Sequence, residues 1–241
     1  MNITVEQTPK QKLSDSIIDK VNSVSIVHLP GIRLSESIRT ATSLRRSNST
    51  VNIIPHIAAR NIKNKQELFS SCERFQDLGI SDVLLIGGGR KTGDCYGNTD
   101  VVLRDIQDKG YSFQKIICGV YPQKETIESV QSTKYKYYSG GITQLCFNLK
   151  QLRSFSDSTT IGVPSNCSLT ELFRFVQFCG IAKSTREMLC NLKGAKYMTY
   201  YGFNTAKFVA DIEAANIHVF NFGNLEKTIE SLVKKIIVGV N

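Results

Sequence analysis

The sequence contains no long apolar run: none approaches the roughly 20 consecutive apolar residues that a membrane-spanning helix requires. Its first residues, Met1–Glu6, do not place an apolar segment behind a basic one, so we expect no secretory signal and no membrane partner. None of the seven cysteines forms a Cys-x-x-Cys pair, and the three histidines stand far apart, so we expect no metal site. The odd number of cysteines, several of them in apolar runs, indicates reduced thiols and a cytoplasmic protein.

The sequence also lacks a dense block of positive charge, although its formal net charge is +9. Its 30 Lys and Arg residues are spread along the chain among 21 acidic residues, and 41% hydrophobic residues indicate a globular protein. We therefore predict a solvated basic surface and no nucleic-acid partner. The functional alternative is that the positive charge attracts a small polyanionic ligand.

Eight strand-like apolar runs recur along the chain, with helix-like stretches between them. They are rich in β-branched residues and nearly continuous in apolar character, as expected for a parallel sheet covered on both faces. No linker rich in Pro or Ser separates them, so we predict one domain over residues 1–241, an α/β fold with a single (β/α)₈ TIM barrel. An open, doubly wound sheet is the structural alternative. The runs are Ile3–Glu6, Val24–His28, Val51–Ile57, Asp82–Ile86, Lys115–Val120, Ile142–Phe147, Thr159–Val163 and Ile217–Phe222.

Signals for the beginning and end of helices support this alternation. The stretch 65–78 is amphipathic and is followed by Gly79, a residue type that commonly ends a helix. Ser168 and Glu171 have the spacing of a capping box that opens the next apolar stretch. Residues 224–237 carry an apolar stripe at helical spacing and are expected to form a final helix.

In a barrel of this kind, functional side chains gather at the C-terminal ends of the strands. Polar, aromatic and glycine residues occur at those positions in this sequence, which is what a binding rim requires. They are Glu6, His28, His56, Gly87–Gly89, Tyr121, Gln144, Pro164–Asn166 and Asn221.

Several of these strand ends together resemble the methylenetetrahydrofolate reductase family, in the family's order and over nearly the whole chain. The family's first strand ends in a Glu followed three residues later by Pro, matched here by Glu6 and Pro9. Its third strand carries Pro-His, matched by Pro55 and His56, and its sixth carries Ile-Thr-Gln-x-x-Phe, matched by Ile142–Phe147. Weaker matches are Gly79–Leu84, Lys134–Lys136, Ser139–Asn148 and Ile161–Pro164.

The resemblance implies an oxidoreductase that binds FAD and a folate, with NADH or NADPH as electron donor. Reduced flavin would pass a hydride to 5,10-methylene-tetrahydrofolate and give 5-methyl-tetrahydrofolate. Glu6 would be the catalytic acid on the N10 side of the folate, because a partly desolvated carboxyl group can hold a proton near neutrality. Gln144 would bind the pterin edge, since its amide offers two donors and an acceptor. The sequence leaves a homo-oligomer open.

The same resemblance assigns flavin contacts to His56, Tyr121 and Lys136. An imidazole can hydrogen-bond ribityl or phosphate oxygens, a lysine can meet the phosphates, and an aromatic ring can pack against a ring system. Each side chain also has an ordinary structural alternative. These alternatives are a histidine held within its strand, a packed tyrosine at the barrel rim, a solvated lysine, a salt bridge for Glu6 and a bond from Gln144 to a neighbouring loop.

Gly87, Gly88 and Gly89 mark a departure from the family. The family has Arg-Gly-Asp after its fourth strand, where this chain has Ile86-Gly87-Gly88 and therefore neither charged side chain. Glycines still permit close backbone approach and anion-binding amides, so the three glycines are predicted to contact the flavin. The missing charges motivate two alternatives: a flavin-independent folate one-carbon enzyme of the same fold, or a non-catalytic folate-binding or regulatory subunit.

Overall fold

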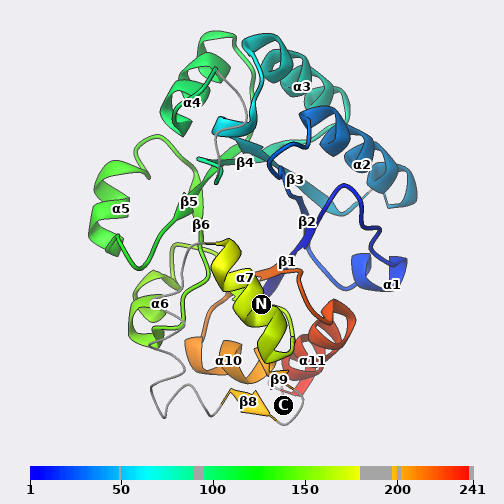
Figure 1. Cartoon of the computed structure of the whole chain (residues 1–241), viewed down its shortest axis with the longest axis vertical. Helices are drawn as coiled ribbons and strands as arrows, with labels where there is room; N and C mark the ends of the chain where they lie inside the picture. The colour runs from blue at the N-terminus through cyan, green and yellow to red at the C-terminus, as the bar shows by residue number, and fades with distance from the viewer. Residues whose placement is uncertain (49, 90–94, 180–196, 200–201, 239–241) are drawn as a thin grey trace. The chain divides into compact units, whose positions relative to one another are not determined.

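The computed structural model describes residues 1–48, 50–89, 95–179, 197–199 and 202–238, and Figure 1 shows how strands and helices alternate along them. Eight strands of the described residues form one sheet in the order β6-β5-β4-β3-β2-β1-β10-β7, and the paired strands run parallel. The two ends of this order meet, because Ile142 of β6 and Thr160 just before β7 form a parallel bridge. The sheet is therefore nearly closed. The predicted (β/α)₈ TIM barrel is confirmed, and the doubly wound alternative is wrong.

The sheet strands are β1 (Asn2–Gln7), β2 (Ser23–Ile26), β3 (Asn52–Ala58), β4 (Asp82–Ile86), β5 (Lys115–Val120), β6 (Gly140–Thr143), β7 (Ile161–Pro164) and β10 (Asn216–Phe220). The helices are α1 (Asp15–Ile18), α2 (Leu34–Ser47), the 3₁₀ turn η1 (Ala59–Asn61), α3 (Lys65–Asp77), α4 (Thr99–Asp108), α5 (Ile127–Thr133), α6 (Leu149–Phe155), α7 (Leu169–Phe178), α10 (Thr205–Ile212) and α11 (Leu225–Val238). Within the described ranges, no helix is both long enough and apolar enough to cross a membrane.

Contacts within the chain fall into two compact units. The first unit comprises Glu6–Gly119 and Tyr137–Gly140, and the second comprises Met1–Val5, Val120–Lys136 and Gly141–Asn241. The single domain over residues 1–241 stays a prediction.

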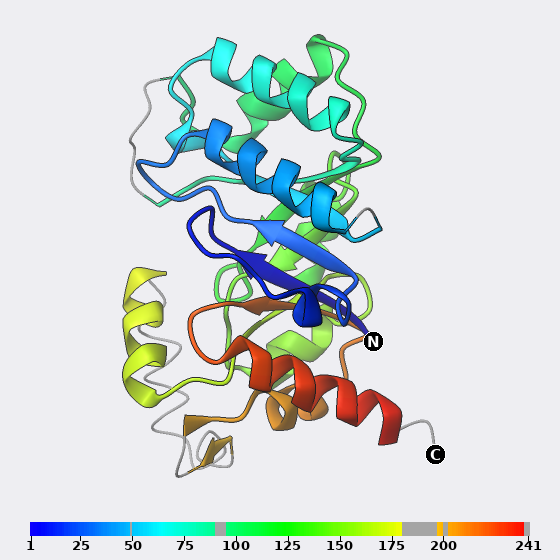
Figure 2. The same cartoon turned by 90° about the vertical axis from the view of Figure 1, so that its right-hand side faces the viewer.

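In the first unit, β2, β3 and β4 pair in register, and α2 and α3 lie side by side in both views of the chain (Figures 1 and 2). The predicted helix over 65–78 is confirmed as α3. The side chain of Asn64 accepts the N–H of Glu67 at its start, and Gly79 follows its end with a φ of +66°. The buried apolar side chains of this unit include Val24, Ile26, Ile53, Ile57, Val83 and Leu85 on the strands and Leu34, Leu44, Leu68 and Phe75 on the helices.

In the second unit, β1, β10 and β7 pair side by side and bury Ile3, Val5, Ile161, Val163, Ile217 and Val219. The predicted capping box is confirmed at the start of α7. The N–H of Ser168 donates to Oε2 of Glu171 at 2.8 Å, and the N–H of Glu171 donates to the hydroxyl of Ser168 at 3.3 Å. The predicted final helix is confirmed as α11.

The sixth strand differs from its prediction. We predict it at Ile142–Phe147, but β6 begins at Gly140 and ends at Thr143. A Cβ on Gly141 would lie 2.5 Å from Cγ2 of Val120, so the chain needs glycine at this close approach, and glycine carries no β-propensity signal. The antiparallel pair β8 (Met198–Thr199) and β9 (Gly202–Phe203) is also absent from the prediction, because strands of two residues show no period.

Candidate functional site

Three polar side chains come together in the first unit, from β1, β2 and β3; we call them the Glu6–Ser25–His56 cluster. The hydroxyl of Ser25 lies 2.6 Å from Nε2 of His56, and a carboxylate oxygen of Glu6 lies within 4.8 Å of a ring nitrogen of His56. Ser25 is fully buried, His56 is 4% exposed and Glu6 is half-buried. Strand alternation explains the position of Ser25, because Val24 and Ile26 on either side of it point to the opposite face.

Hydrogen bonding around Ser25 determines which nitrogen of His56 carries a proton. The hydroxyl of Ser25 donates to the carbonyl of Ile54 at 3.2 Å. A serine hydroxyl has a single proton, so its oxygen must accept the bond from Nε2–H of His56. In the neutral ring, Nδ1 is then the basic nitrogen. Ser25 therefore sets the tautomer and the ring orientation of His56.

Ser25→Ala is expected to lower the free energy of unfolding by about 1–3 kcal/mol, because the buried Nε2–H of His56 would lose its acceptor. Ser37→Ala is the matched control. The hydroxyl of Ser37 is equally buried, in α2, but has no hydrogen-bond partner among the residues that the structure describes. Its removal is expected to be neutral or stabilising. Urea denaturation followed by circular dichroism measures both variants, and equal losses would contradict the assigned hydrogen bond.

His28, two residues after β2, is a structural residue. Its Nδ1 accepts the N–H of Ala58 at 3.1 Å, and its Nε2 donates to the carbonyl of Ile32 at 3.0 Å. Nδ2 of Asn61 donates to the carbonyl of His28 at 3.0 Å. Burial lowers the pKa of this imidazole from its ordinary value, against the opposing effect of the bond to Ile32. A neutral ring fits both bonds, and it ties the loop after β2 to the end of β3.

The lowered pKa of His28 makes stability depend on pH. Below its ordinary pKa of 6.5, the unfolded chain takes up a proton at His28 that the folded chain does not. The free energy of unfolding therefore falls as the pH drops from 6.5 towards the lowered folded value, by at most about 1.4 kcal/mol per pH unit from this group. His28→Gln is expected to reduce the stability difference between about pH 7.5 and about pH 5.5, measured by urea denaturation. An unchanged difference in the variant would contradict a buried, neutral His28.

Gly87–Gly89, after β4, packs against η1. The carbonyl of Gly87 accepts the N–H of Arg60 at 3.1 Å, and the carbonyl of Gly88 accepts Nη1 of Arg60 at 3.4 Å. Gly88 has a φ of +80°, and a Cβ there would lie 3.4 Å from Cβ of Ala58. Glycine is therefore needed at this turn for its conformation. The segment is a tight turn that Arg60 holds through its carbonyls.

In the second unit, Tyr121 belongs to a charged cluster directly after β5. Its N–H donates to Oε2 of Glu125 at 2.7 Å. Nζ of Lys134 pairs with Oε1 of Glu125 at 2.8 Å and lies 5.1 Å from the centroid of the Tyr121 ring. Lys136, the residue that the resemblance assigns to a flavin phosphate, is exposed in the segment after α5. The lysine that meets Tyr121 is therefore Lys134, and the flavin contact assigned to Lys136 stays a prediction.

The amide of Gln144 is also engaged within the second unit. Its Nε2 donates to the carbonyl of Cys179, the residue that follows α7, at 3.1 Å. This bond corresponds to the structural alternative for Gln144, a bond to a neighbouring segment. It occupies one of the two amide donors, and contact with a pterin stays a prediction.

Of the predicted site residues, the structure brings together Glu6 and His56 in the first unit. Sequence reasoning missed Ser25, which completes their cluster. A signal for it exists: Ser25 is a small polar residue between the apolar Val24 and Ile26. A polar residue at such a position needs a partner when its strand is buried.

The flavin contacts that the resemblance implies stay predictions. Nε2 of His56 is buried against Ser25, and the carbonyls of Gly87 and Gly88 are bound to Arg60. The ribityl and phosphate oxygens of a flavin need donors, and these bonds occupy one ring nitrogen and two carbonyl acceptors of the first unit. The geometry therefore brings Glu6 and His56 together and leaves the cofactor a prediction.

No protein-family model matches the sequence, and no curated protein matches it significantly. Solved structures match in fold. The tryptophan synthase alpha chain from Legionella pneumophila subsp. pneumophila has a TM-score of 0.55 and 11% identity, over 98% of this chain and 91% of its own. A chitinase, RmChi1 from Rhizomucor miehei, has a TM-score of 0.53 and 7% identity, over 97% and 99%. A xylanase-A-amylase inhibitor protein, XAIP-III, has a TM-score of 0.50 and 9% identity, over 97% and 98%. At these identities the matches show that the chain has the (β/α)₈ TIM barrel fold, which enzymes and an inhibitor share.

Proposed function

We propose that the chain is an enzyme that reduces a one-carbon unit bound to a folate, the reaction class of the methylenetetrahydrofolate reductases. The observation that carries the proposal is the meeting of Glu6 and His56, which the resemblance assigns to one site from two separate strands. Both lie near the C-terminal ends of barrel strands, where barrel enzymes carry their chemistry. The formal net charge of +9 also suits the polyglutamate tail that cellular folates carry.

In this reaction a hydride adds to the methylene carbon of 5,10-methylene-tetrahydrofolate, the bond from that carbon to N10 breaks, and N10 takes up a proton. Glu6 supplies the proton as a carboxylic acid and becomes a carboxylate. His56, whose Nε2–H is held by Ser25, accepts and returns protons at Nδ1. Glu6 and His56 lie within 4.8 Å, a gap that one water molecule can bridge to reload Glu6 after turnover.

Within this reaction class we propose that NADH or NADPH delivers the hydride directly. This form is favoured over one with FAD because Ile86-Gly87-Gly88 lacks both charged side chains of the family's Arg-Gly-Asp and because Nε2 of His56 is bonded to Ser25. The flavin-mediated reaction is the second candidate, because the resemblance through Glu6, Pro9, Pro55 and His56 implies it. The two forms differ in a property that is easily measured, the visible spectrum of the purified protein.

The test combines that spectrum with an anaerobic assay. We expect a colourless protein that takes up no FAD and that converts methylene-tetrahydrofolate to 5-methyl-tetrahydrofolate with NADH or NADPH, the product being measured by chromatography. A yellow protein, or a rate that depends on added FAD, would favour the flavin-mediated candidate. Folate binding without turnover under either condition would contradict the proposal that the chain is an enzyme and would favour a non-catalytic binding subunit. Absence of both binding and turnover would contradict a folate as the substrate.

A further inference from the structure

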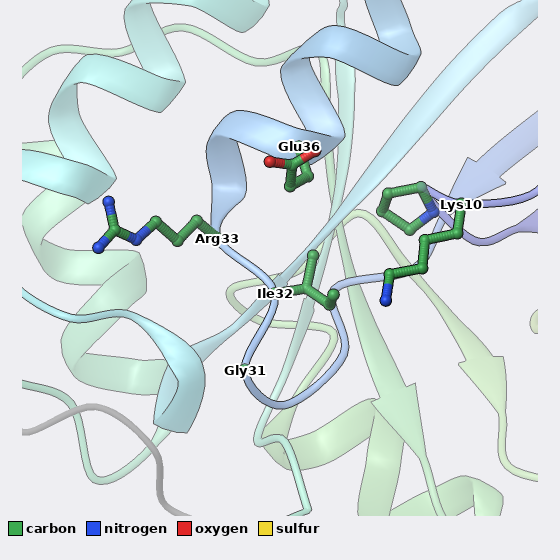
Figure 3. Close-up of a pocket in the computed structure, with 6 residues that line it drawn as sticks. Lys10, Gly31, Ile32, Arg33 and Glu36 are labelled. Atoms are coloured by element: carbon green, nitrogen blue, oxygen red, sulfur yellow. The ribbon is translucent and has the colours of Figure 1, made fainter.

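A short loop lies between β2 and α2; we call it the 29–33 loop (Leu29–Arg33). In Figure 3 it turns at Gly31 and runs through Ile32 and Arg33 into the first turn of α2. Gly31 has a φ of +77°, and the N–H of Ile32 donates to the carbonyl of Leu29 at 3.1 Å, so the loop contains a hydrogen-bonded turn. Its residues are half-buried or exposed, so it can move without exposing much apolar surface.

The main chain is anchored on both sides of the 29–33 loop. On the side of β2, the carbonyl of His28 accepts Nδ2 of Asn61 at 3.0 Å. On the side of α2, the N–H of Leu34 donates to Oε1 of Glu67 at 3.3 Å. Movement of the loop is therefore confined to the residues between these two anchors.

The side chain of His28 ties the 29–33 loop to β3. Its ring is 2% exposed, Nδ1 accepts the N–H of Ala58 at 3.1 Å, and Nε2–H donates to the carbonyl of Ile32 at 3.0 Å. One face of this link is the backbone at the end of β3, and the other is the loop. The link requires a neutral ring, because only a neutral imidazole can accept at one nitrogen while it donates from the other.

Protonation of His28 breaks one of these bonds and keeps the other. In the imidazolium both nitrogens are donors, so Nδ1–H would face the N–H of Ala58 with no acceptor between them. The N–H of Ala58 belongs to the backbone of β3 and cannot turn aside. Nε2–H still donates to the carbonyl of Ile32. The ring therefore leaves β3 and carries the 29–33 loop with it.

Charged groups on the neighbouring elements act on this step. Burial lowers the pKa of His28, whereas its bond to the loop carbonyl and the carboxylate of Glu67 on α3 act in the opposite sense. Arg60 of η1 is bonded to carbonyls of the segment after β4, and Arg33 of the loop is exposed. On β3, the titratable neighbour is His56, two residues before Ala58. The ring is therefore neutral near pH 7 and takes up a proton only in acid.

We propose that His28 and the 29–33 loop form a pH-sensitive latch, in which the neutral imidazole holds the loop against the end of β3 and the imidazolium releases it. Both anchors of the loop persist during release. The loop lines a pocket of about 390 Å³ together with Pro9 and Lys10 of the loop after β1, so release changes the wall of that pocket. The latch depends on contacts within the first unit and not on the reaction that the chain catalyses.

Hydrogen exchange followed by NMR tests the latch in the wild-type chain, with the Ala58 amide as reporter. Because proton uptake is coupled to release, the released population rises by up to about tenfold for each pH unit below 6.5. We expect the protection factor of Ala58 to fall by up to about tenfold between about pH 6.5 and about pH 5.5, and by less than about twofold between about pH 7.5 and about pH 6.5. Low urea should leave this exchange unchanged, because a local release exposes little surface, and should accelerate exchange at Leu85 in β4.

Two outcomes in the wild-type chain would overturn the latch. Protection of Ala58 that does not fall with pH would show that the bond to Nδ1 survives in acid. Urea that accelerates Ala58 and Leu85 alike at about pH 5.5 would show that Ala58 exchanges only through global unfolding.

Variants identify the group that titrates. His28→Asn places an amide oxygen near the position of Nδ1 and takes up no proton, so the protection of Ala58 is expected to lose its fall in acid. Glu36→Gln is the matched control, because Glu36 is a titratable residue beside the loop whose carboxylate is paired with Arg39. It is expected to keep the wild-type fall. A fall that persists in His28→Asn would overturn the role of His28, and the urea comparison in the wild-type chain decides the case if that variant does not fold.

Discussion

Glu6→Gln is expected to lower kcat by about 10²–10⁴-fold while the affinity for the folate stays within a few-fold of wild type. Gln has nearly the shape of Glu and keeps a carbonyl oxygen towards His56. Its amide cannot give a proton to N10 when the bond from N10 to the methylene carbon breaks. The hydride would then have to add while a poor leaving group departs without its proton, which raises the barrier of the chemical step.

Steady-state kinetics and folate titration together measure this prediction. Glu73→Gln is the matched control, because Glu73 is an exposed carboxylate on α3, outside the Glu6–Ser25–His56 cluster. It is expected to leave kcat and KM unchanged. Turnover that persists in Glu6→Gln would contradict the role of Glu6 as the acid. Loss of folate affinity in proportion to the loss of rate would assign Glu6 to binding, because the interaction would then exist in the ground state as well.

The barrel could be predicted from sequence because the signals for its strands and helices are local and recur along the chain. Runs such as Ile53 and Ile54 in β3, or Ile116 and Ile117 in β5, are apolar and β-branched, and the helices between them begin and end at residues with a clear physical role. Ser168 and Glu171 are one example, because they bond the free N–H groups at the start of α7. Gly79 is another, because it takes the positive φ that ends α3. Eight such units in succession leave few folds that bury them all.

The site could be predicted only in part, because its contacts join residues that are distant in sequence. Glu6 and His56 stand at the ends of strands, so the barrel rule selects both. Nothing local to Ser25 says that its hydroxyl meets His56, which lies one strand further along. Likewise, Lys134 and Lys136 are both lysines at the end of α5, and only the structure shows that Lys134 reaches Glu125.

The assignments that came from the resemblance had a different weakness. A motif carries over residue types and spacing, but not what surrounds each side chain. Pro55 and His56 stand as in the family, yet Nε2 of His56 is buried against Ser25, a residue outside the matched motif. The Gly87–Gly89 segment shows the same point, because the carbonyls of Gly87 and Gly88 are bound to Arg60, which no matched motif contains.

Gly162→Ala is expected to cause the largest loss of stability, about 3 kcal/mol or more in the free energy of unfolding. A Cβ at Gly162 would lie 2.2 Å from the carbonyl oxygen of Thr143 and 2.6 Å from Cε2 of Phe220. Neither neighbour can move aside without a large cost in free energy. The first is backbone of β6, and the ring of Phe220 packs against Phe175 at a centroid distance of 5.5 Å. The added methyl group must therefore push β7 and β6 apart.

That displacement acts where β6 and β7 meet and close the sheet. The N–H of Gly162 donates to the hydroxyl of Thr143 at 2.8 Å, and the N–H of Thr143 donates to the carbonyl of Thr160 at 2.9 Å. Both bonds should lengthen in the variant, so hydrogen exchange at these two amides should accelerate more than the global loss explains. Gly140→Ala, in β6, is the control, because a Cβ there meets nothing within 4 Å and its expected effect is within about 0.5 kcal/mol. Equal urea midpoints for the two variants would contradict the close approach of β6 and β7, on which the closure of the sheet depends.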